Sequence, residues 1–174
     1  MDSDAIWTHL ELPLEWLLNH WSINPNTSLA ISEDWAVCTA ADGKRCLNTG
    51  FIVAQQSERT QEILRAWDGC TTGQQFPGCE ELAWWRTYDQ KAFNDYIVAA
   101  YMESNDLTRL SCDETDGSPG AMAGCEGVFV RHFWGDKMGV KAGFAEGIMR
   151  AVAGRLHEEF VGQRERVAVK EAVA

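Results

Sequence analysis

Short apolar stretches separated by polar, glycine-containing segments recur along the first 130 residues of the chain. Such stretches, rich in branched and aromatic side chains and bounded by turn residues, are typical of strands. The stretch over residues 47–54 ends in Phe-Ile-Val-Ala, which predicts a strand inside a sheet rather than at its edge. Gly50 within it marks a place where another backbone or a ligand comes close. Strands are predicted at residues 28–32, 47–54, 107–110 and 127–132.

Between these strands, apolar residues three and four positions apart predict helices. Pro13 begins a short helix, and Ser57 caps a helix over residues 58–67. Asp89 caps a third helix, which runs to about residue 103. After Gly139 a last helix carries apolar residues at four-residue steps, which are Val140, Phe144, Ile148, Val152 and Leu156.

Strands and helices that do not alternate strictly predict an α/β domain, with a mixed sheet flanked by helices. A chain of 174 residues forms one domain, or one large piece of a two-lobed domain. We expect the domain to span residues 1–160, because the Arg, Glu and Val repeats that follow are typical of a flexible tail over residues 161–174. The small number of strands predicts that part of the sheet is absent.

The net charge of −11 argues against a nucleic-acid partner, because phosphates and an acidic surface repel each other. We therefore expect a neutral partner, or an anion carried by a metal. No stretch has the length of a membrane span, and residues 1–11 lack the basic and apolar runs of a signal peptide. The protein is therefore either cytosolic or lacks its original N-terminus.

Six cysteines lie in loops rich in Gly, Thr and Asp, and no two of them form the Cys-x-x-Cys pair of a zinc site. In an oxidising compartment three disulfides would hold these loops, whereas six free thiols in a cytosolic protein are the alternative. A glycosylation sequon at Asn26 agrees with a secretory lumen. The cysteines are Cys38, Cys46, Cys70, Cys79, Cys112 and Cys125.

Asp2 and Asp4 stand one residue apart at the start of the chain. In an extended loop their carboxylates project to the same side, so both reach one hard cation and leave coordination positions for ligand oxygens. The alternative is a solvated surface, where short acidic triplets are common.

Three further candidates also have structural alternatives. His132 ends the predicted strand 127–132, where it is either a metal ligand or a histidine satisfied by a backbone carbonyl. Asp89 is a helix cap, a catalytic carboxylate, or both. Trp84 and Trp85 are large aromatic residues that pack in the core or between lobes on the structural alternative.

Four motifs follow one another along the chain, namely Asp2-Ser3-Asp4, Asn48-Thr49-Gly50-Phe51, Asp89-Gln90 with Phe93-Asn94, and Val130-Arg131-His132-Phe133-Trp134-Gly135. In this order they resemble the later half of a GT-A-fold, nucleotide-sugar-dependent glycosyltransferase. The chain is similar to the fungal galactosyl- and mannosyltransferase family of the Golgi and to its plant xylosyltransferase relatives. The resemblance extends from Met1 to about Gly139 and implies a partial GT-A, Rossmann-like fold.

The resemblance implies a retaining glycosyltransferase that moves a hexose, galactose or mannose, from a nucleotide sugar to a glycan or glycoprotein acceptor. Asp2, Asp4 and His132 would then bind Mn²⁺ or Mg²⁺, which neutralises the leaving nucleotide diphosphate. Lys137 would add charge to the same diphosphate.

The resemblance also assigns the residues around the sugar. Asp89 would lie nearest the anomeric carbon or the acceptor, and Gln90 and Asn48 would hold sugar hydroxyls. Trp84 or Trp85 would stack on an acceptor sugar. Two routes to retention stay open, a covalent glycosyl intermediate on a carboxylate or attack by the acceptor hydroxyl from the leaving-group face. The implied catalytic residues are Asp89 and Gln90, and the implied substrate-binding residues are Asn48, Gly50, Trp85, Gly135 and Lys137.

In that family a Rossmann-like half that binds the nucleotide precedes the acidic triplet, whereas here only Met1 precedes it. We therefore expect a truncated fragment of a Golgi-lumen enzyme, joined to the membrane only through a missing N-terminal anchor. The interval from His132 to Lys137 is also one residue shorter than in glycogenin-like relatives. The alternatives are a non-catalytic secreted binding module on the same framework and an incomplete gene model.

Overall fold

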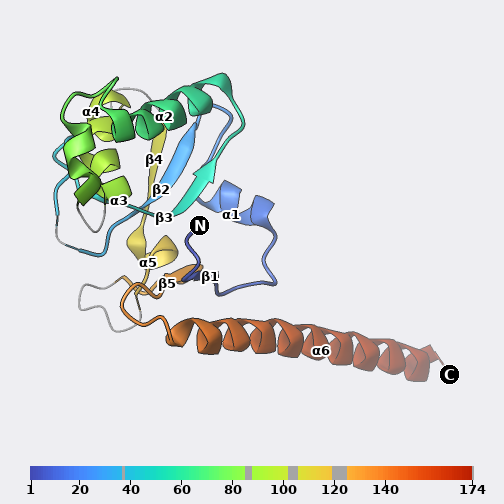
Figure 1. Cartoon of the computed structure of the whole chain (residues 1–174). Helices are drawn as coiled ribbons and strands as arrows, with labels where there is room; N and C mark the ends of the chain where they lie inside the picture. The colour runs from blue at the N-terminus through green and yellow to red at the C-terminus, as the bar shows by residue number, and fades with distance from the viewer. Residues whose placement is uncertain (37, 85–87, 102–105, 119–124, 174) are drawn as a thin grey trace.

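The computed structural model describes residues 1–36, 38–84, 88–101, 106–118 and 125–173. Within these residues the protein is a mixed α/β domain built on two small sheets, with a long helix at the C-terminal end (Figure 1). The α/β class predicted from the sequence is therefore confirmed.

The larger sheet has the strand order β3-β2-β4. β2 (Leu29–Glu33) runs antiparallel to β3 (Leu47–Ala54) and parallel to β4 (Leu107–Leu110), so the sheet is mixed as predicted. The prediction that residues 47–54 form an interior strand is wrong, because β3 is an edge strand of this sheet. Its apolar side chains are buried by packing against other segments and not by a second neighbouring strand. Phe51, for example, belongs to a core formed with segments that precede β2.

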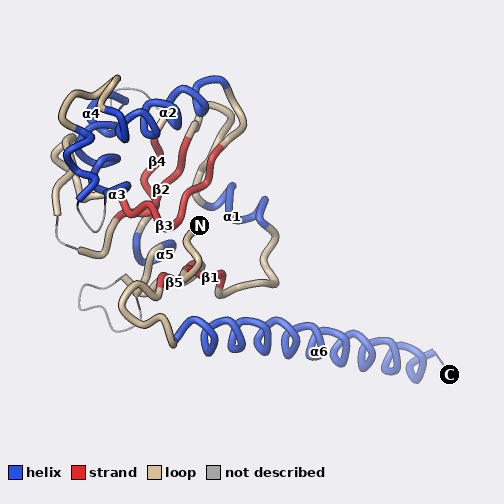
Figure 2. The backbone as a smooth tube through the Cα atoms, viewed as in Figure 1, coloured by secondary structure: helices blue, strands red, loops and turns tan. Residues whose placement is uncertain are grey.

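Alternate residues of β2 face two different cores, because successive side chains of a strand point to opposite faces. Leu29 and Ile31 belong to the core that α2 (Glu58–Asp68), η3 (Phe93–Ile97) and α4 (Val98–Tyr101) complete. Figure 2 shows these helices on the same side of the larger sheet. Each fully buried Leu, Ile or Phe side chain in this core contributes about 1.5–3 kcal/mol.

The opposite face of β2 packs against the smaller sheet and against α1 (Leu14–His20), the helix predicted to begin at Pro13. In the smaller sheet β1 (Ala5–Trp7) pairs antiparallel with β5 (Val130–His132). Ala5 lies opposite His132 in this pairing, so the first and the last of the four sequence motifs lie side by side here. The smaller sheet thus joins the N-terminal acidic triplet to the predicted histidine.

The strand predicted at residues 127–132 is shorter in the structure and begins at Val130. Gly127 has φ 64°, and the two backbone N–H groups that follow it donate to carbonyls of α5 (Cys112–Thr115). The N–H groups of Val128 and Phe129 therefore bind α5, while their carbonyls accept hydrogen bonds from Thr8, the residue after β1.

The helix expected to follow Asp89 includes that residue, because Tyr88 is already helical and Asp89 lies in the first turn of α3 (Tyr88–Ala92). The prediction that Asp89 caps this helix is therefore wrong. α3 continues into the π-helical turn η3, where Asn94 accepts a hydrogen bond from the Leu47 N–H at 2.7 Å and donates one to the Leu47 carbonyl at 2.8 Å. This side-chain amide binds the first residue of β3 as a neighbouring strand would, and it holds α3 beside β3.

Three disulfides join the six cysteines, which confirms the number predicted from the sequence. The structure pairs them as Cys38–Cys46, Cys70–Cys79 and Cys112–Cys125. The second joins η1 (Gly69–Thr72) to η2 (Cys79–Trp84), and the third joins α5 to the segment before β5. Three disulfides in a chain of this size are typical of an oxidising compartment. Across the described residues, no helix combines the length and apolar character needed to cross a membrane.

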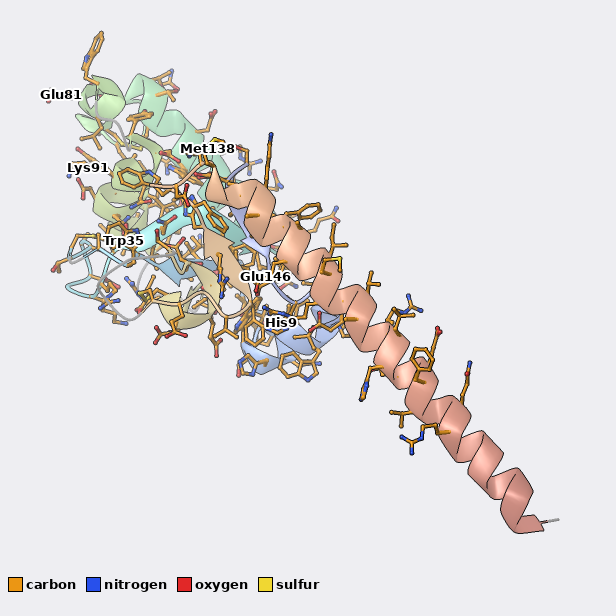
Figure 3. All side chains as sticks on the ribbon, turned by 90° about the horizontal axis from the view of Figure 1, so that it is seen from below. His9, Trp35, Glu81, Lys91, Met138 and Glu146 are labelled. Carbon is orange, nitrogen blue, oxygen red and sulfur yellow. A yellow bond between two sulfur atoms is a disulfide. The ribbon has the colours of Figure 1, made fainter. Side chains whose placement is uncertain are left out.

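The C-terminal helix α6 (Gly139–Val173) lies against β1 through its glycines and projects beyond the rest of the domain (Figure 3). A Cβ at Gly143 would lie 2.7 Å from Phe133 Cζ and 2.8 Å from Ile6 Cδ1, so a larger residue here would force these two side chains to move. The apolar residues at four-residue steps lie elsewhere on the helix, and Phe144, Ile148, Val152 and Leu156 are exposed. The helix continues through residues 161–173, the range for which the sequence predicts a flexible tail.

Candidate metal site and adjoining pocket

The pairing of β1 with β5 brings the start of the chain to His132. The Asp4 carbonyl accepts a hydrogen bond from the Phe133 N–H at 2.8 Å, which fixes the acidic triplet beside the end of β5. His132 Nε2 lies 3.6 Å from Asp2 Oδ2 and 3.5 Å from Asp4 Oδ1. The ligand atoms of these three residues lie within 4.8 Å of one another, so a single cation can contact all of them. The structure thus brings together the three residues predicted as metal ligands.

The His132 ring is buried between carboxylates. Nδ1 lies 2.9 Å from Asp116 Oδ1, whereas Nε2 has no hydrogen-bond partner among the described residues. Burial opposes protonation of His132, but the hydrogen bond to Asp116 and the charges of Asp116, Asp4 and Asp2 outweigh it, so its pKa lies above 6.5. Burial raises the pKa of Asp116 to about 6, against the opposing effect of His132. The alternative of a histidine satisfied by a backbone carbonyl is wrong, because its side-chain partner is a carboxylate.

Gly50 provides the space that the His132 ring occupies. A Cβ at Gly50 would lie 2.4 Å from His132 Cε1 and 2.7 Å from Nδ1. β3 bulges here, because its pairing with β2 moves from Ile52 to Asn48 across a single step of β2. The Gly50 carbonyl also accepts a hydrogen bond from the Asp2 N–H at 2.7 Å. The close approach predicted at Gly50 is therefore made by the N-terminal backbone and by the imidazole ring.

Lys137 forms an ion pair with Asp4 Oδ2. Burial opposes ionisation of Asp4, but Lys137 and His132 outweigh this effect and hold its pKa below 3.8. The Lys137 side chain is 66% exposed, whereas that of Asp4 is 8% exposed, so the lysine reaches this carboxylate from the solvent side. An ammonium group therefore lies directly beside the candidate metal ligands.

A pocket of about 340 Å³ adjoins the metal-ligand cluster and shares Asp2 and His132 with it. Asn48, Asp89 and Gln90, which the sequence predicts to bind sugar or act in catalysis, also line this pocket. The remaining lining residues are Asp34, Trp35, Ala36, Thr49 and Trp134. Asp2, Asp34 and Asp89 are among the described lining residues, and none of these is a lysine or arginine, so the pocket suits a ligand with hydroxyl groups better than an anion.

Hydrogen bonds join the elements that form the pocket wall. Thr49 Oγ1 donates to Asp89 Oδ2 at 3.1 Å, which links β3 to the first turn of α3. The Gln90 side chain donates to Asp34 Oδ2, which links α3 to the loop after β2. Asn48 Oδ1 accepts a hydrogen bond from the Gly50 N–H at 2.8 Å and so satisfies a donor within the bulge of β3. Asn48 therefore supports the backbone as well as lining the pocket.

The tryptophans at the pocket differ from those considered in the sequence. Trp84 is 92% exposed and does not line the pocket, so the prediction that it packs in the core is wrong. Trp85 lies outside the described residues. Trp35, on the loop after β2, and Trp134, after β5, line the pocket instead. Gly135 follows in an exposed turn, where a Cβ would meet no atom within 4 Å.

Two buried acidic residues of the site were not predicted from the sequence. Asp34 directly follows β2, and a polar residue just beyond the carboxyl end of a buried strand is a signal that could have found it. Asp116 lies in a segment rich in Asp and Gly, where nothing in the sequence distinguishes it from Asp113. Only the tertiary structure places Asp116 against His132.

The residues of the cluster fit a divalent cation such as Mn²⁺ or Mg²⁺. Two carboxylates and one imidazole are suitable ligands for such ions. His132 Nε2 is buried without a hydrogen-bond partner among the described residues, and it faces both carboxylates. A cation between them would satisfy this nitrogen, whose burial without a partner is otherwise costly.

No protein-family model, no curated protein and no solved structure matches the chain.

Proposed function

We propose that this domain is the metal- and acceptor-binding part of a retaining glycosyltransferase, on a partial GT-A fold. The reaction moves galactose or mannose from a nucleotide sugar to a glycan or glycoprotein acceptor. The observation that carries the proposal is the convergence of Asp2, Asp4 and His132 within 4.8 Å of one another, beside a polar pocket. Both features suit transfer from a nucleotide sugar, because a bound cation neutralises the leaving diphosphate and the sugar occupies a site next to it.

At the diphosphate end, Asp2, Asp4 and His132 would hold Mn²⁺ or Mg²⁺. Such an ion, when bound, neutralises the charge that develops on the departing nucleotide diphosphate. Lys137 supplies a second positive charge beside the same ligands, since it pairs with Asp4. These residues bind and orient the leaving group.

At the sugar end, the carboxylates of Asp34 and Asp89 accept hydrogen bonds from sugar hydroxyls, as Gln90 and Asn48 also do through their amides. Trp35 and Trp134 offer aromatic faces for the apolar side of a sugar ring. The described lining residues include three aspartates and no lysine or arginine, which supports an uncharged hexose as the transferred group.

In this proposal the Asp89 carboxylate lies beside the anomeric carbon of the donor sugar or beside the acceptor hydroxyl. In one route its carboxylate attacks the anomeric carbon while the bond to the diphosphate oxygen breaks, and the diphosphate leaves with the electron pair. In the other route the acceptor hydroxyl attacks from the leaving-group face and its proton passes to the departing phosphate oxygen. Both routes retain the configuration at the anomeric carbon, the first after a second displacement by the acceptor.

The Golgi lumen is the proposed location. The three disulfides and the exposed sequon residue Asn26 support a compartment of the secretory pathway. The catalytic assignment does not depend on the location. Experiments do need an expression host with an oxidising compartment, because the disulfides must form.

Calorimetric titration of the protein with Mn²⁺ tests the metal site. We expect wild-type protein to bind Mn²⁺ and Asp4→Asn to bind it at least about tenfold more weakly. Glu146→Gln, which removes an exposed carboxylate on α6 that pairs with Arg150, is the matched control and should bind like the wild type. Equal affinities of wild type and Asp4→Asn would refute the metal site.

A second titration of the Mn²⁺-loaded protein with a panel of nucleotide sugars tests the donor. Saturable binding of a galactose or mannose donor, lost in Asp4→Asn, is the expected result. A protein that binds Mn²⁺ and glycans but no nucleotide sugar would instead be a non-catalytic binding module.

A further inference from the structure

The His132 ring has to present one particular nitrogen to the candidate cation. A neutral imidazole carries its proton on one ring nitrogen, and only the other nitrogen has a lone pair for a metal. Nε2 is the nitrogen that faces Asp2 and Asp4, at 3.6 and 3.5 Å. The proton therefore has to stay on Nδ1 for the site to bind a metal.

Asp116 is the group that faces Nδ1. Its Oδ1 lies 2.9 Å from Nδ1, and its side chain is fully buried. Its second oxygen, Oδ2, has no hydrogen-bond partner among the described residues. A carboxylate in this position accepts a hydrogen bond from Nδ1–H and disfavours the tautomer with its lone pair on Nδ1, since two lone pairs would then face each other.

The backbone around Asp116 fixes its position relative to the ring. The Asp116 N–H donates to the Cys112 carbonyl at 3.2 Å, and the next residue, Gly117, accepts a hydrogen bond from the His132 N–H at 2.8 Å. A Cβ at Gly117 would lie 1.9 Å from the Gly127 nitrogen, so the chain passes here only because residue 117 is a glycine. The disulfide Cys112–Cys125 joins the same two segments.

Asp116 itself is on the wrong side of the ring to bind the cation. It contacts Nδ1, whereas the cluster of possible ligand atoms is formed by Asp2, Asp4 and Nε2 of His132. A pair of residues that served packing alone would give no reason for Nε2 to be buried without a partner among the described residues.

We propose that Asp116 is a positioning residue, which holds His132 in the Nδ1–H tautomer and so directs the Nε2 lone pair at a divalent cation between Asp2 and Asp4. This inference rests on the proposed metal site. It explains why Asp116 is buried with His132, and not with a lysine or arginine, as its side-chain partner among the described residues. Carboxylates that orient ligand histidines in this way typically change metal affinity about 10- to 100-fold.

The test uses ¹⁵N-histidine-labelled, metal-free protein at alkaline pH, where the ring is neutral, and reads the His132 tautomer from its ring ¹⁵N shifts. We expect Nδ1–H in the wild type, the Nε2–H form in Asp116→Ala, and retention of Nδ1–H in Asp116→Asn, whose Oδ1 still accepts. Asp113→Ala, on the neighbouring turn and exposed, is the matched control and should keep the wild-type tautomer.

Mn²⁺ titration monitored by electron paramagnetic resonance supplies the second measurement. Asp116→Ala should bind Mn²⁺ about 10- to 100-fold more weakly than the wild type, with Asp116→Asn between them. Nε2–H in the wild type overturns the inference, even if Asp116→Ala does not fold. So does an Asp116→Ala protein that keeps both the wild-type tautomer and the wild-type Mn²⁺ affinity.

Failure of the proposed function gives a different result. If the wild type binds no Mn²⁺, both the metal site and the positioning role of Asp116 are refuted, whichever tautomer His132 adopts. If the wild type binds Mn²⁺ but the tautomer and affinity do not depend on residue 116, only the positioning role is lost.

Discussion

Gly50→Ala tests whether the space beside His132 is essential to the site. The added Cβ would lie 2.4 Å from His132 Cε1, 2.7 Å from Nδ1 and 2.9 Å from Asn48 Oδ1. Ordinary contacts of such atoms are longer by roughly 1 Å, so the ring has to move out of the site. Moving the ring breaks its 2.9 Å hydrogen bond to Asp116 and turns Nε2 away from the acidic pair.

The expected cost has two parts. Overpacking of this kind lowers the free energy of unfolding by about 1–3 kcal/mol, and replacing a strand glycine by alanine returns roughly 0.5–1 kcal/mol of backbone entropy. We therefore expect a net loss of about 1–2 kcal/mol in urea denaturation, together with at least a tenfold loss of Mn²⁺ affinity by calorimetry.

Gly135→Ala is the matched control for this experiment. A Cβ at Gly135 meets no atom within 4 Å, so its stability should stay within about 0.5 kcal/mol of the wild type and its Mn²⁺ affinity should not change. A Gly50→Ala protein that matches the Gly135→Ala protein in both measurements would refute the packing argument.

Three further predictions concern residues around the site and the core. Lys137→Met should tighten Mn²⁺ binding a few-fold and weaken nucleoside diphosphate binding in the same titrations, because it removes the cation paired with a metal ligand. Asn94→Ala should lower the free energy of unfolding by about 2–3 kcal/mol in urea, since the first residue of β3 loses both partners of its buried backbone groups. Burial opposes ionisation of Asp42, but a backbone amide and Arg109 outweigh it and hold its pKa below 3.8. This stabilisation is present at neutral pH and is lost as the pH falls through the lowered pKa. Arg109→Met should therefore show a smaller fall in melting temperature below about pH 4 than the wild type does.

The chain's local patterns determined much of the secondary structure. Branched apolar runs gave β3 and β4 their bounds, and Ser57 accepts the Thr60 N–H at 3.0 Å as an N-cap should. The six loop cysteines gave three disulfides. These features depend on residues close in sequence, or on a chemistry that leaves few partners, so a linear pattern is sufficient to predict them.

The position of the long-range contacts depended on the fold. A strand's own residues do not say which neighbour it has, so β3 turned out to be an edge strand buried by the N-terminal segment. The aromatic lining of the pocket comes from Trp35 and Trp134, which no local signal distinguishes from Trp84.

The candidate site also combines features that the sequence predicts with features that only the fold determines. The residue types Asp2, Asp4 and His132 were readable in the sequence, because two carboxylates and a histidine have a recognisable metal chemistry. Their convergence needed the β1–β5 pairing, and the burial of Asp116 behind the ring needed the close passage of Gly117 beside Gly127. Contacts between segments more than a hundred residues apart are set by packing of the whole domain, and no short stretch of the chain contains that information.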